Sequence, residues 1–322
     1  MAPPLGYIPP ADLDPAALAA HRAAESVLPA FAMPPVPEGV DKVVLTECWK
    51  HPRVVQALGY EFPGYHQLTG FCVGAGGGNA LATCSFLDVL RRGHTERIVR
   101  PDPLRPYGRS REIIGWNYQG EGSTGAAFAR AVLEGTPDGL TDGIPRPEVR
   151  DGLEFGASVE MRWSAARNNP AGVITEGKKH PVQTVAASLT TSDQVRDAVA
   201  NGYPCTFANS LYVGRASVQG TPPVCVGRFD GSGGHQTSIQ GWWNHPQLGE
   251  LFLYVNQWTA STYPADPGGG PRCSCWVTRD ELERRFNARD RFGNPDVECY
   301  PFSSYDGYPA QPDIPQLLDW RI

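Results

Sequence analysis

The feature that most constrains the fold is a pair of hydrophobic segments around a short polar turn, GSGGHQTSIQGWWNHPQLGELFLYVNQW, at residues 231–258. The turn at Asn244-His245-Pro246 and the aromatic and β-branched residues around it are typical of two paired antiparallel strands. If these strands pair, His235 and Asn256 lie near the ends that point away from the turn. Their side chains can then meet, so the hairpin brings a histidine and an asparagine together.

Helix signals dominate the first half of the chain, and strand signals dominate the second half. Asp14 followed by Pro15 indicates a helix start, because aspartate caps free N–H groups and proline fits the first helical position. We expect that helix to reach about Leu28, further helices at 79–92, 123–134, 192–201 and 276–286, and a strand at 203–208. This segregation predicts an α+β fold with two lobes.

Composition limits the possible classes of protein. Hydrophobic residues make up 41% of the chain and charged residues 19%, as in globular proteins, while 36 glycines and 31 prolines indicate many loops. The net charge of −6 argues against a nucleic-acid partner. No segment approaches the roughly 18–20 apolar residues that cross a membrane, and the N-terminus lacks the features of a secretory signal. We therefore expect no membrane partner and, by default, a cytoplasmic location.

Neither a metal nor a cofactor is expected. Cys273 and Cys275 form a Cys-x-Cys pair with Cys299 downstream, but a fourth ligand at zinc-like spacing is missing. The glycines of 74–78 lack the spacing of a phosphate-binding loop. The pattern leaves the role of the three cysteines open.

A cysteine suited to this histidine is Cys72, in HQLTGFCVGAGGGNALATC. It lies at the start of a predicted helix, where partial positive charge and free N–H groups favour a thiolate. A nearby histidine can take the thiol proton, and an asparagine can orient its ring without adding a full charge. Gln67 and the backbone N–H of Cys72 are candidates for holding an oxyanion. Trp258 is placed to shield the asparagine–histidine hydrogen bond.

The order Gln-x4-Cys, Gly-Gly-His and Asn-x-Trp resembles that of the papain-like cysteine peptidases, over about residues 60–290. GEGSTGAAFARAVL and SSYDGYPAQ are similar to a divergent branch of these proteins found in tailed phages and environmental bacteria. The resemblance implies a two-lobed papain fold. A helical lobe would carry Cys72, a β-barrel-like lobe would carry His235 and Asn256, and the active site would lie in the cleft between them. It also implies supporting roles for Gln67, Trp258 and Gly234.

The sequence departs from the family pattern near the cysteine. Four residues separate Gln67 from Cys72, where the family usually has five, and Val73 replaces the usual aromatic residue. The glycines of 76–78 weaken the helix by about 1 kcal/mol each relative to alanine, or they let another backbone pass close by.

We expect two parts along the chain, a Pro/Ala-rich N-terminal arm at residues 1–40 and a papain-like domain at 41–322. Within the domain we expect a mainly helical lobe at 41–180 and a mainly β lobe with the C-terminal tail at 181–322. The arm is too short and too proline-rich for the usual helical propeptide, so we expect no inhibitory propeptide.

By this resemblance we expect a phage-encoded papain-like cysteine peptidase or related thiol acyl-hydrolase that acts on a peptide or protein substrate. The resemblance also implies the bacterial host cytoplasm or an assembled virion as its location. An alternative is a virion structural or decoration protein that uses the fold as an inactive or weakly active scaffold and contacts other virion proteins through its arm. A second alternative is a peptidoglycan amidase or endopeptidase. We expect an enzyme to hold Cys72 with a lowered pKa in an open cleft, whereas a scaffold could fill that cleft with its own chain.

Overall fold

A computed structural model of the 322-residue chain describes residues 6–28, 30, 33–93, 98–116, 121–133, 185–258 and 261–303. Its helices are α1 (Pro15–Ser26), α2 (Pro52–Leu58), α3 (Cys72–Leu90), α4 (Leu104–Ile113), α5 (Gly125–Leu133), α8 (Ser192–Ala200) and α9 (Arg279–Phe286), with 3-10 helices η1 (Pro10–Asp12) and η2 (Leu45–Lys50). Its strands are β1 (Lys42–Val44), β2 (Cys205–Gln219), β3 (Val224–His245), β4 (Gly249–Val255) and β5 (Ser274–Thr278). The predicted α+β class is confirmed.

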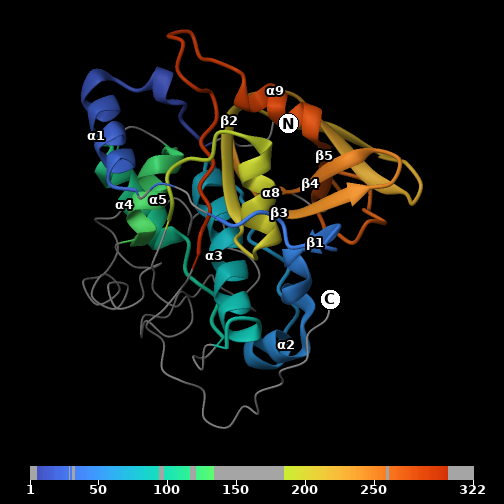
Figure 1. Ribbon diagram of the computed structural model, residues 1–322. Helices are drawn as coiled ribbons and strands as arrows, with labels where there is room; N and C mark the ends of the chain where they lie inside the picture. The colour runs from blue at the N-terminus through green and yellow to red at the C-terminus, as the bar shows by residue number, and fades with distance from the viewer. Residues whose placement is uncertain are drawn as a thin grey trace.

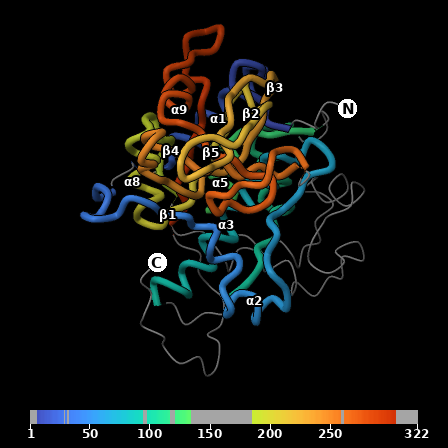
Figure 2. The backbone as a smooth tube through the Cα atoms, turned by 90° about the vertical axis from the view of Figure 1, so that its right-hand side faces the viewer, coloured from blue at the N-terminus to red at the C-terminus, as the bar shows by residue number. Residues whose placement is uncertain are grey.

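Helix α3 runs through the centre of the molecule, with α1, α4 and α5 on one side and the strands on the other (Figure 1). Figure 2 views the same arrangement from the side of the sheet. Every residue of α3 from Cys72 to Val89 is buried. None of the helices in the described parts of the chain is long and apolar enough to span a membrane.

The glycines of α3 allow this helix to lie directly against the backbone of β3. A Cβ atom at Gly76 would lie 2.9 Å from both the Gln236 carbonyl oxygen and the Thr237 Cα. Contacts this short are absent from real side chains, so only glycine fits. Of the two interpretations of the glycine run, close approach of another backbone is the one that the structure supports at this position.

The strands form one sheet in which β3 is the central member. It pairs antiparallel with β1, β2 and β4, and β5 pairs with β4 and, through one parallel pair, with β3. The strands β3, β4 and β5 therefore close on themselves, as in a small barrel. The predicted hairpin is present, with Ser238 of β3 opposite Val255 of β4. This register places His235 and Asn256 just beyond the last pairs, at the end away from the turn.

Several predicted boundaries differ from the observed ones. The hydroxyl of Thr124, not Ser123, caps α5 by accepting the N–H of Ala127 at 3.2 Å. The helix expected at 276–286 begins only at Arg279, because its first residues form β5, which packs into the sheet. His235 lies within the long strand β3 rather than at its start. Position 134 and the tail beyond 303 lie outside the described residues.

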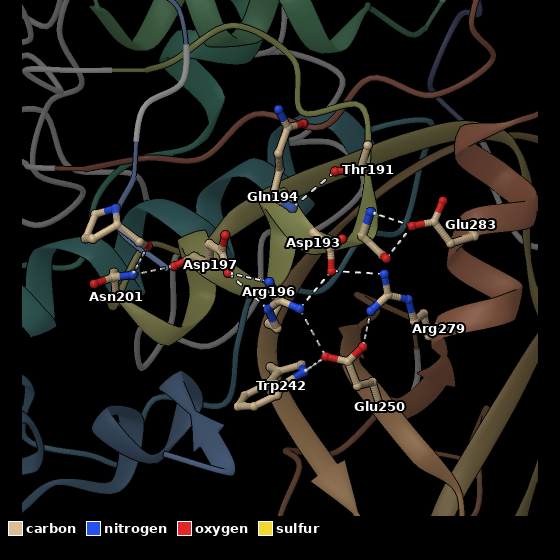
Figure 3. Close-up of polar contacts among 12 residues, drawn as sticks. Thr191, Asp193, Gln194, Arg196, Asp197, Asn201, Trp242, Glu250, Arg279 and Glu283 are labelled. Carbon is tan, nitrogen blue, oxygen red and sulfur yellow. Dashed lines mark hydrogen bonds and ion pairs between the residues drawn. The ribbon is translucent and has the colours of Figure 1, made fainter. Parts of the chain in front are cut away.

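A network of charged side chains ties α8 to β4 and α9 (Figure 3). Arg196 pairs with Asp193 at 2.7 Å, and Arg279 reaches the same carboxylate at 2.9 Å while also pairing with Glu250. At the start of α8, the carboxylate of Glu283 accepts the N–H of Ser192 at 3.0 Å. This carboxylate replaces a missing intrahelical partner and complements the positive end of the helix.

Replacing Gly76 by alanine tests the close approach of α3 and β3. Alanine normally stabilises a helix interior by about 1 kcal/mol relative to glycine. Here the added methyl group must push apart two backbones, so we expect Gly76→Ala to lower the free energy of unfolding by about 1–3 kcal/mol in denaturant titrations. Ala23→Gly at an exposed position of α1 gives the helix-propensity effect alone. A stabilised Gly76→Ala protein would show that the approach is looser than described.

Candidate active site

Cys72 is the first residue of α3, and a tightly bonded loop sets its position. The backbone N–H of Gly70 donates to Glu121 at 2.6 Å, and the Tyr107 hydroxyl donates to the Gly70 carbonyl at 2.9 Å. No side chain caps the helix, and its N-cap is Phe71. The first N–H groups of α3 therefore point toward the thiol end of the helix, where they favour negative charge.

His235 is held by an asparagine on its edge and by a tryptophan on its face. Its Nε2 atom lies 3.0 Å from Oδ1 of Asn256. The ring of Trp258 stacks on the imidazole with centroids 4.5 Å apart and an interplanar angle of 21°. Tyr212 contacts both rings edge-on. The arrangement fixes the orientation of the histidine ring and shields its hydrogen bond from water.

A chain of hydrogen bonds also fixes which ring nitrogen carries the proton. The hydroxyl of Tyr263 donates to the carbonyl of Val213 at 2.7 Å, so its oxygen accepts the Asn256 Nδ2 group at 2.8 Å. The other end of that amide, Oδ1, accepts the N–H of Gln257 at 2.8 Å. Oδ1 is therefore an acceptor toward His235, whose Nε2 must carry the proton. The lone pair of the neutral ring then lies on Nδ1.

The other end of this hydrogen-bond chain depends on an irregularity in β2. The pairing register of β2 with β3 shifts on both sides of Val213. Such bulges leave backbone groups outside the regular ladder. The Val213 carbonyl is thereby available to Tyr263. Tyr263 could not be predicted from the sequence, because a residue beyond the strand end has no periodic pattern to identify it.

Cys72 lies beside the strand that carries His235, where α3 touches β3. The N–H of Gln236, the residue after the histidine, donates to Cys72 Sγ at 3.5 Å. Its side-chain Nε2 donates to the Val73 carbonyl at 3.1 Å, and the Gln257 amide bridges the Cys72 and Gln236 carbonyls at 3.4 and 2.5 Å. His235 Nδ1 is buried without a hydrogen-bond partner in the described structure. The hydrogen bonds of these two glutamines hold the start of α3 against β3, and neither glutamine was predicted.

Gln67 lies in the loop before α3, but its side chain bonds within that loop. Its Nε2 donates to the Thr69 carbonyl at 3.1 Å, and its backbone N–H donates to the Gln257 carbonyl at 2.9 Å. The neighbouring His66 bonds the Trp258 carbonyl through Nδ1 at 2.8 Å. Gln67 therefore lies next to the segment that follows Asn256, close to the other predicted site residues. The role of its side chain as an oxyanion donor stays a prediction.

The N-terminal arm covers the thiol. The N–H of Gly6 donates to Cys72 Sγ at 3.2 Å, and the segment from Gly6 to Ile8 pairs with Ser123 through two backbone hydrogen bonds of 2.9 and 2.8 Å. On the opposite side a Cβ atom at Gly234 would lie 2.1 Å from the Tyr7 carbonyl oxygen. As a result, 0% of Cys72 and 1% of His235 is exposed. The space in front of the thiol is filled by the protein's own chain.

Burial keeps both groups neutral. Desolvation raises the pKa of Cys72 to about 12, although N–H groups of Gln236, Gly6, Tyr7 and Val73 oppose the shift. Desolvation also lowers the pKa of His235 to about 4, with the Asn256 hydrogen bond acting in the opposite direction. At neutral pH the pair is therefore a thiol and an imidazole. The expectations of an open cleft and a lowered Cys72 pKa are wrong for this conformation, because the arm excludes water from both groups.

The geometry of the Gly6 contact does not suit attack on the arm at that residue. A sulfur that accepts a peptide N–H lies near the plane of the peptide group, whereas a nucleophile approaches a carbonyl carbon from above that plane. The sequence predicts no inhibitory propeptide of the usual helical kind, and this stays a prediction, but the structure shows that the arm covers Cys72. A helical propeptide is not needed, since a short extended segment covers the thiol.

The cysteines with open roles are buried thiols. All eight cysteines are free, and among the described residues no cluster of three or more potential ligands is placed to hold a metal ion. Cys273 adopts a left-handed backbone conformation with φ of 61°, which is uncommon outside glycine. Its carbonyl accepts the N–H of Asn256 at 3.0 Å. This conformation helps to position the asparagine.

No protein-family model matches the sequence, and no curated protein matches it. Solved structures are similar in fold. Xylellain, a cysteine protease from Xylella fastidiosa, superimposes with a TM-score of 0.58 and 14% identity over 93% of this chain and 96% of that one. A procathepsin B from Trypanosoma congolense gives a TM-score of 0.49 and 11% identity over 88% of each chain. The fold is therefore papain-like, as the sequence motifs predict.

The tautomer of His235 depends on Tyr263, and this can be measured. Tyr263→Phe removes one of the two contacts that orient the Asn256 amide, the other being the Gln257 N–H, so we expect His235 to populate the Nδ1–H form beside the Nε2–H form. Imidazole nitrogen shifts from ¹⁵N NMR at pH 7 report the two forms directly. Tyr65→Phe, which removes a buried hydroxyl that bonds the Pro101 carbonyl, is the matched control. An unchanged Nε2–H signal in Tyr263→Phe would contradict the role of the hydrogen-bond chain.

The lowered pKa of His235 also predicts a pH-dependent stability. Between pH 6.5 and 4 the unfolded chain binds a proton at this histidine while the folded chain does not, so stability falls as pH falls through this window. Above pH 6.5 both states are neutral and the effect is absent. Relative to His235→Gln, which cannot titrate, we expect the native protein to lose up to about 3 kcal/mol of unfolding free energy. If urea titrations show that the unfolding free energies of the two proteins change in parallel with pH, the pKa of His235 in the folded protein is not lowered.

Proposed function

We propose that the chain is a papain-like cysteine peptidase, or a related thiol acyl-hydrolase, held in a latent state by its N-terminal arm. The observation that supports this most is the fixed Nε2–H tautomer of His235, which leaves Nδ1 as a base beside the start of α3. Buried His245 also has a fixed tautomer, but both of its ring nitrogens are bonded to backbone groups. His235 differs because its Nδ1 lone pair has no hydrogen-bond partner in the described structure, and a general base needs such a lone pair.

The proposed mechanism begins when the arm leaves. Cys72 transfers its proton to Nδ1 of His235, and the resulting thiolate attacks a substrate carbonyl to form a thioester acyl-enzyme. The imidazolium returns the proton to the leaving amine, and water then hydrolyses the thioester. Asn256 keeps the ring oriented, Trp258 excludes water from that hydrogen bond, and Gln67 with the Cys72 N–H stabilises the oxyanion.

The alternative of a scaffold protein draws support from the filled site. A filled site was the expectation for a protein that uses the fold without its chemistry. The covering segment, however, is attached to the body through two close glycine contacts, two backbone hydrogen bonds to Ser123 and one buried side chain, that of Tyr7. Its release therefore costs the burial of one aromatic side chain rather than the unfolding of the core. An origin in phages or environmental bacteria, contacts with virion proteins and action on peptidoglycan stay predictions from the sequence.

Releasing the arm should make Cys72 reactive. A Cβ atom at Gly6 would lie 1.6 Å from the Gly70 carbonyl oxygen, so Gly6→Ala cannot keep the arm in place. We expect Cys72 in Gly6→Ala to be alkylated by iodoacetamide near pH 6 at least ten times faster than in the native protein, as mass spectrometry of the Cys72 peptide would show. Ala23→Ser, at an exposed arm position, is the control that should change nothing.

Adding His235→Ala to Gly6→Ala separates the two interpretations. If a thiolate–imidazolium pair forms, this double variant labels slowly at pH 6 and titrates like a free thiol near pH 8.5. If labelling of Cys72 in Gly6→Ala titrates near pH 8.5 whether or not His235 is present, no thiolate–imidazolium pair has formed. The scaffold interpretation would then replace the peptidase.

A further inference from the structure

A single residue of the arm spans the gap between the thiol and a neighbouring stretch of backbone. The N–H of Gly6 donates to Cys72 Sγ at 3.2 Å, while its carbonyl accepts the N–H of Ser123 at 2.9 Å. The Ser123 carbonyl in turn accepts the N–H of Ile8 at 2.8 Å. The gap therefore matches one residue of an extended chain, and we call the backbone of 122–123 the peptide edge.

The hydroxyl of Tyr107 joins the thiol end of α3 to the peptide edge on the side of the body. It donates to the Gly70 carbonyl at 2.9 Å and accepts the N–H of Gly122 at 2.8 Å. Gly70 lies two residues before Cys72. Gly122 directly precedes the other side of the gap, so few rotatable bonds separate this hydroxyl from either side. Only 1% of Tyr107 is exposed, and burial raises its pKa, so the hydroxyl keeps the proton that it donates.

Glu121 holds the same glycine through its other backbone group. Its carboxylate accepts the N–H of Gly70 at 2.6 Å. The peptide groups on both sides of Gly70 are thus bonded to side chains, one from Tyr107 on α4 and one from the residue before the peptide edge. The ring of Tyr107 also packs edge-on against Phe71, with centroids 4.9 Å apart. The backbone that leads into Cys72 is therefore held at every residue from 70 to the start of the helix.

These contacts remain available to a peptide that replaces the arm. The three hydrogen bonds join parts of the body only, so release of the arm removes none of them. Ser123 then offers one N–H and one carbonyl, which an extended chain can use in either direction. Binding there helps the reaction only if it places the substrate carbonyl at Cys72, and an error of about 1 Å can lower a rate roughly 100-fold.

We propose that Tyr107 and Glu121 are positioning residues that set the spacing between Cys72 and the peptide edge. This assignment rests on the proposed peptidase function and adds how the thiol is aligned with a bound main chain. Neither side chain touches the reacting atoms, since both act through the backbone of Gly70. Their loss should impair reaction with peptides and spare reaction with a small reagent, because a small reagent does not use the edge.

Two electrophiles that differ in their peptide part test this spacing. In full-length Gly6→Ala, N-acetyl-Ala-Gly chloromethyl ketone and chloroacetone each alkylate Cys72, whose thiolate displaces chloride. Their rates are compared at about pH 9, where an ordinary thiol is mostly ionised, by mass spectrometry of the Cys72 peptide. We expect Tyr107→Phe and Glu121→Ala each to lower the ratio of peptide to chloroacetone rates about tenfold, with the chloroacetone rate unchanged.

Two control variants separate spacing from general effects of substitution. Tyr65→Phe removes another buried tyrosine hydroxyl, which bonds the Pro101 carbonyl, and should leave the ratio unchanged. Glu121→Gln keeps a side-chain oxygen that can accept the Gly70 N–H and should also leave it unchanged. If Tyr107→Phe does not fold, Glu121→Ala decides alone, since Glu121 is exposed.

An unchanged ratio in either folded variant overturns the proposal. Equal slowing of both reagents also overturns it, because the side chains would then act on the thiol itself, and so does a peptide reagent that is no faster than chloroacetone in Gly6→Ala. If labelling of Cys72 titrates near pH 8.5 whether or not His235 is present, the peptidase function fails, while the ratio at pH 9 still tests the spacing.

The native chain offers the same test if Gly6→Ala leaves Cys72 covered. There the arm takes the place of the peptide, and its fit depends on the same gap. Glu121→Ala in the native chain should then raise the chloroacetone rate at Cys72 about tenfold, because the gap no longer matches Gly6. Glu121→Gln should not raise it. No rise in Glu121→Ala overturns the proposal.

Discussion

The contact between the glycine face of α3 and the backbone of β3 is the constraint on which the candidate site depends. Because no side chain separates them at Gly76, the first turn of the helix reaches the strand that carries His235. The amides of Gln236 and Gln257 then bond the helix carbonyls that this approach leaves within reach. A helix with an ordinary side chain at this position would have to stand further away, and the thiol would not face the N–H next to the histidine.

The same contact explains which parts of the site could be predicted from the sequence. Cys72 lies at the start of a helix and Asn256 just beyond the end of a strand, and the hydrophobic patterns of the helix and the hairpin therefore predict where they lie, whereas His235 lies within the long strand β3. The glycines of α3 could be interpreted in two ways, because glycine occurs both where a helix is weakened and where another backbone approaches closely. Tyr263 could not be predicted. It lies in a loop beyond β4, and its partner is a carbonyl made available by an irregularity in another strand.

The arm shows a different limit of sequence-based prediction. Its prolines argue against a helical inhibitor, and that argument is sound for a segment that must pack as helices. What covers Cys72 is instead a short extended segment whose contacts are mainly backbone groups, and backbone groups are the same in every sequence. The signals that remain are Gly6 within a proline-rich stretch and Gly234 before the histidine. Both are needed because each lies against the backbone of another segment, and neither has a pattern that distinguishes it from an ordinary loop glycine.

Coverage by the arm controls protonation as well as access. Desolvation acts on the two groups in opposite directions, raising the pKa of Cys72 and lowering the pKa of His235, and both shifts favour the neutral pair. The hydrogen bonds that fix Nδ1 as the basic nitrogen do not involve the arm, since they run through Asn256 and Tyr263. The tautomer of His235 is therefore set by contacts outside the arm, whereas the neutral charge of Cys72 and His235 depends on their burial.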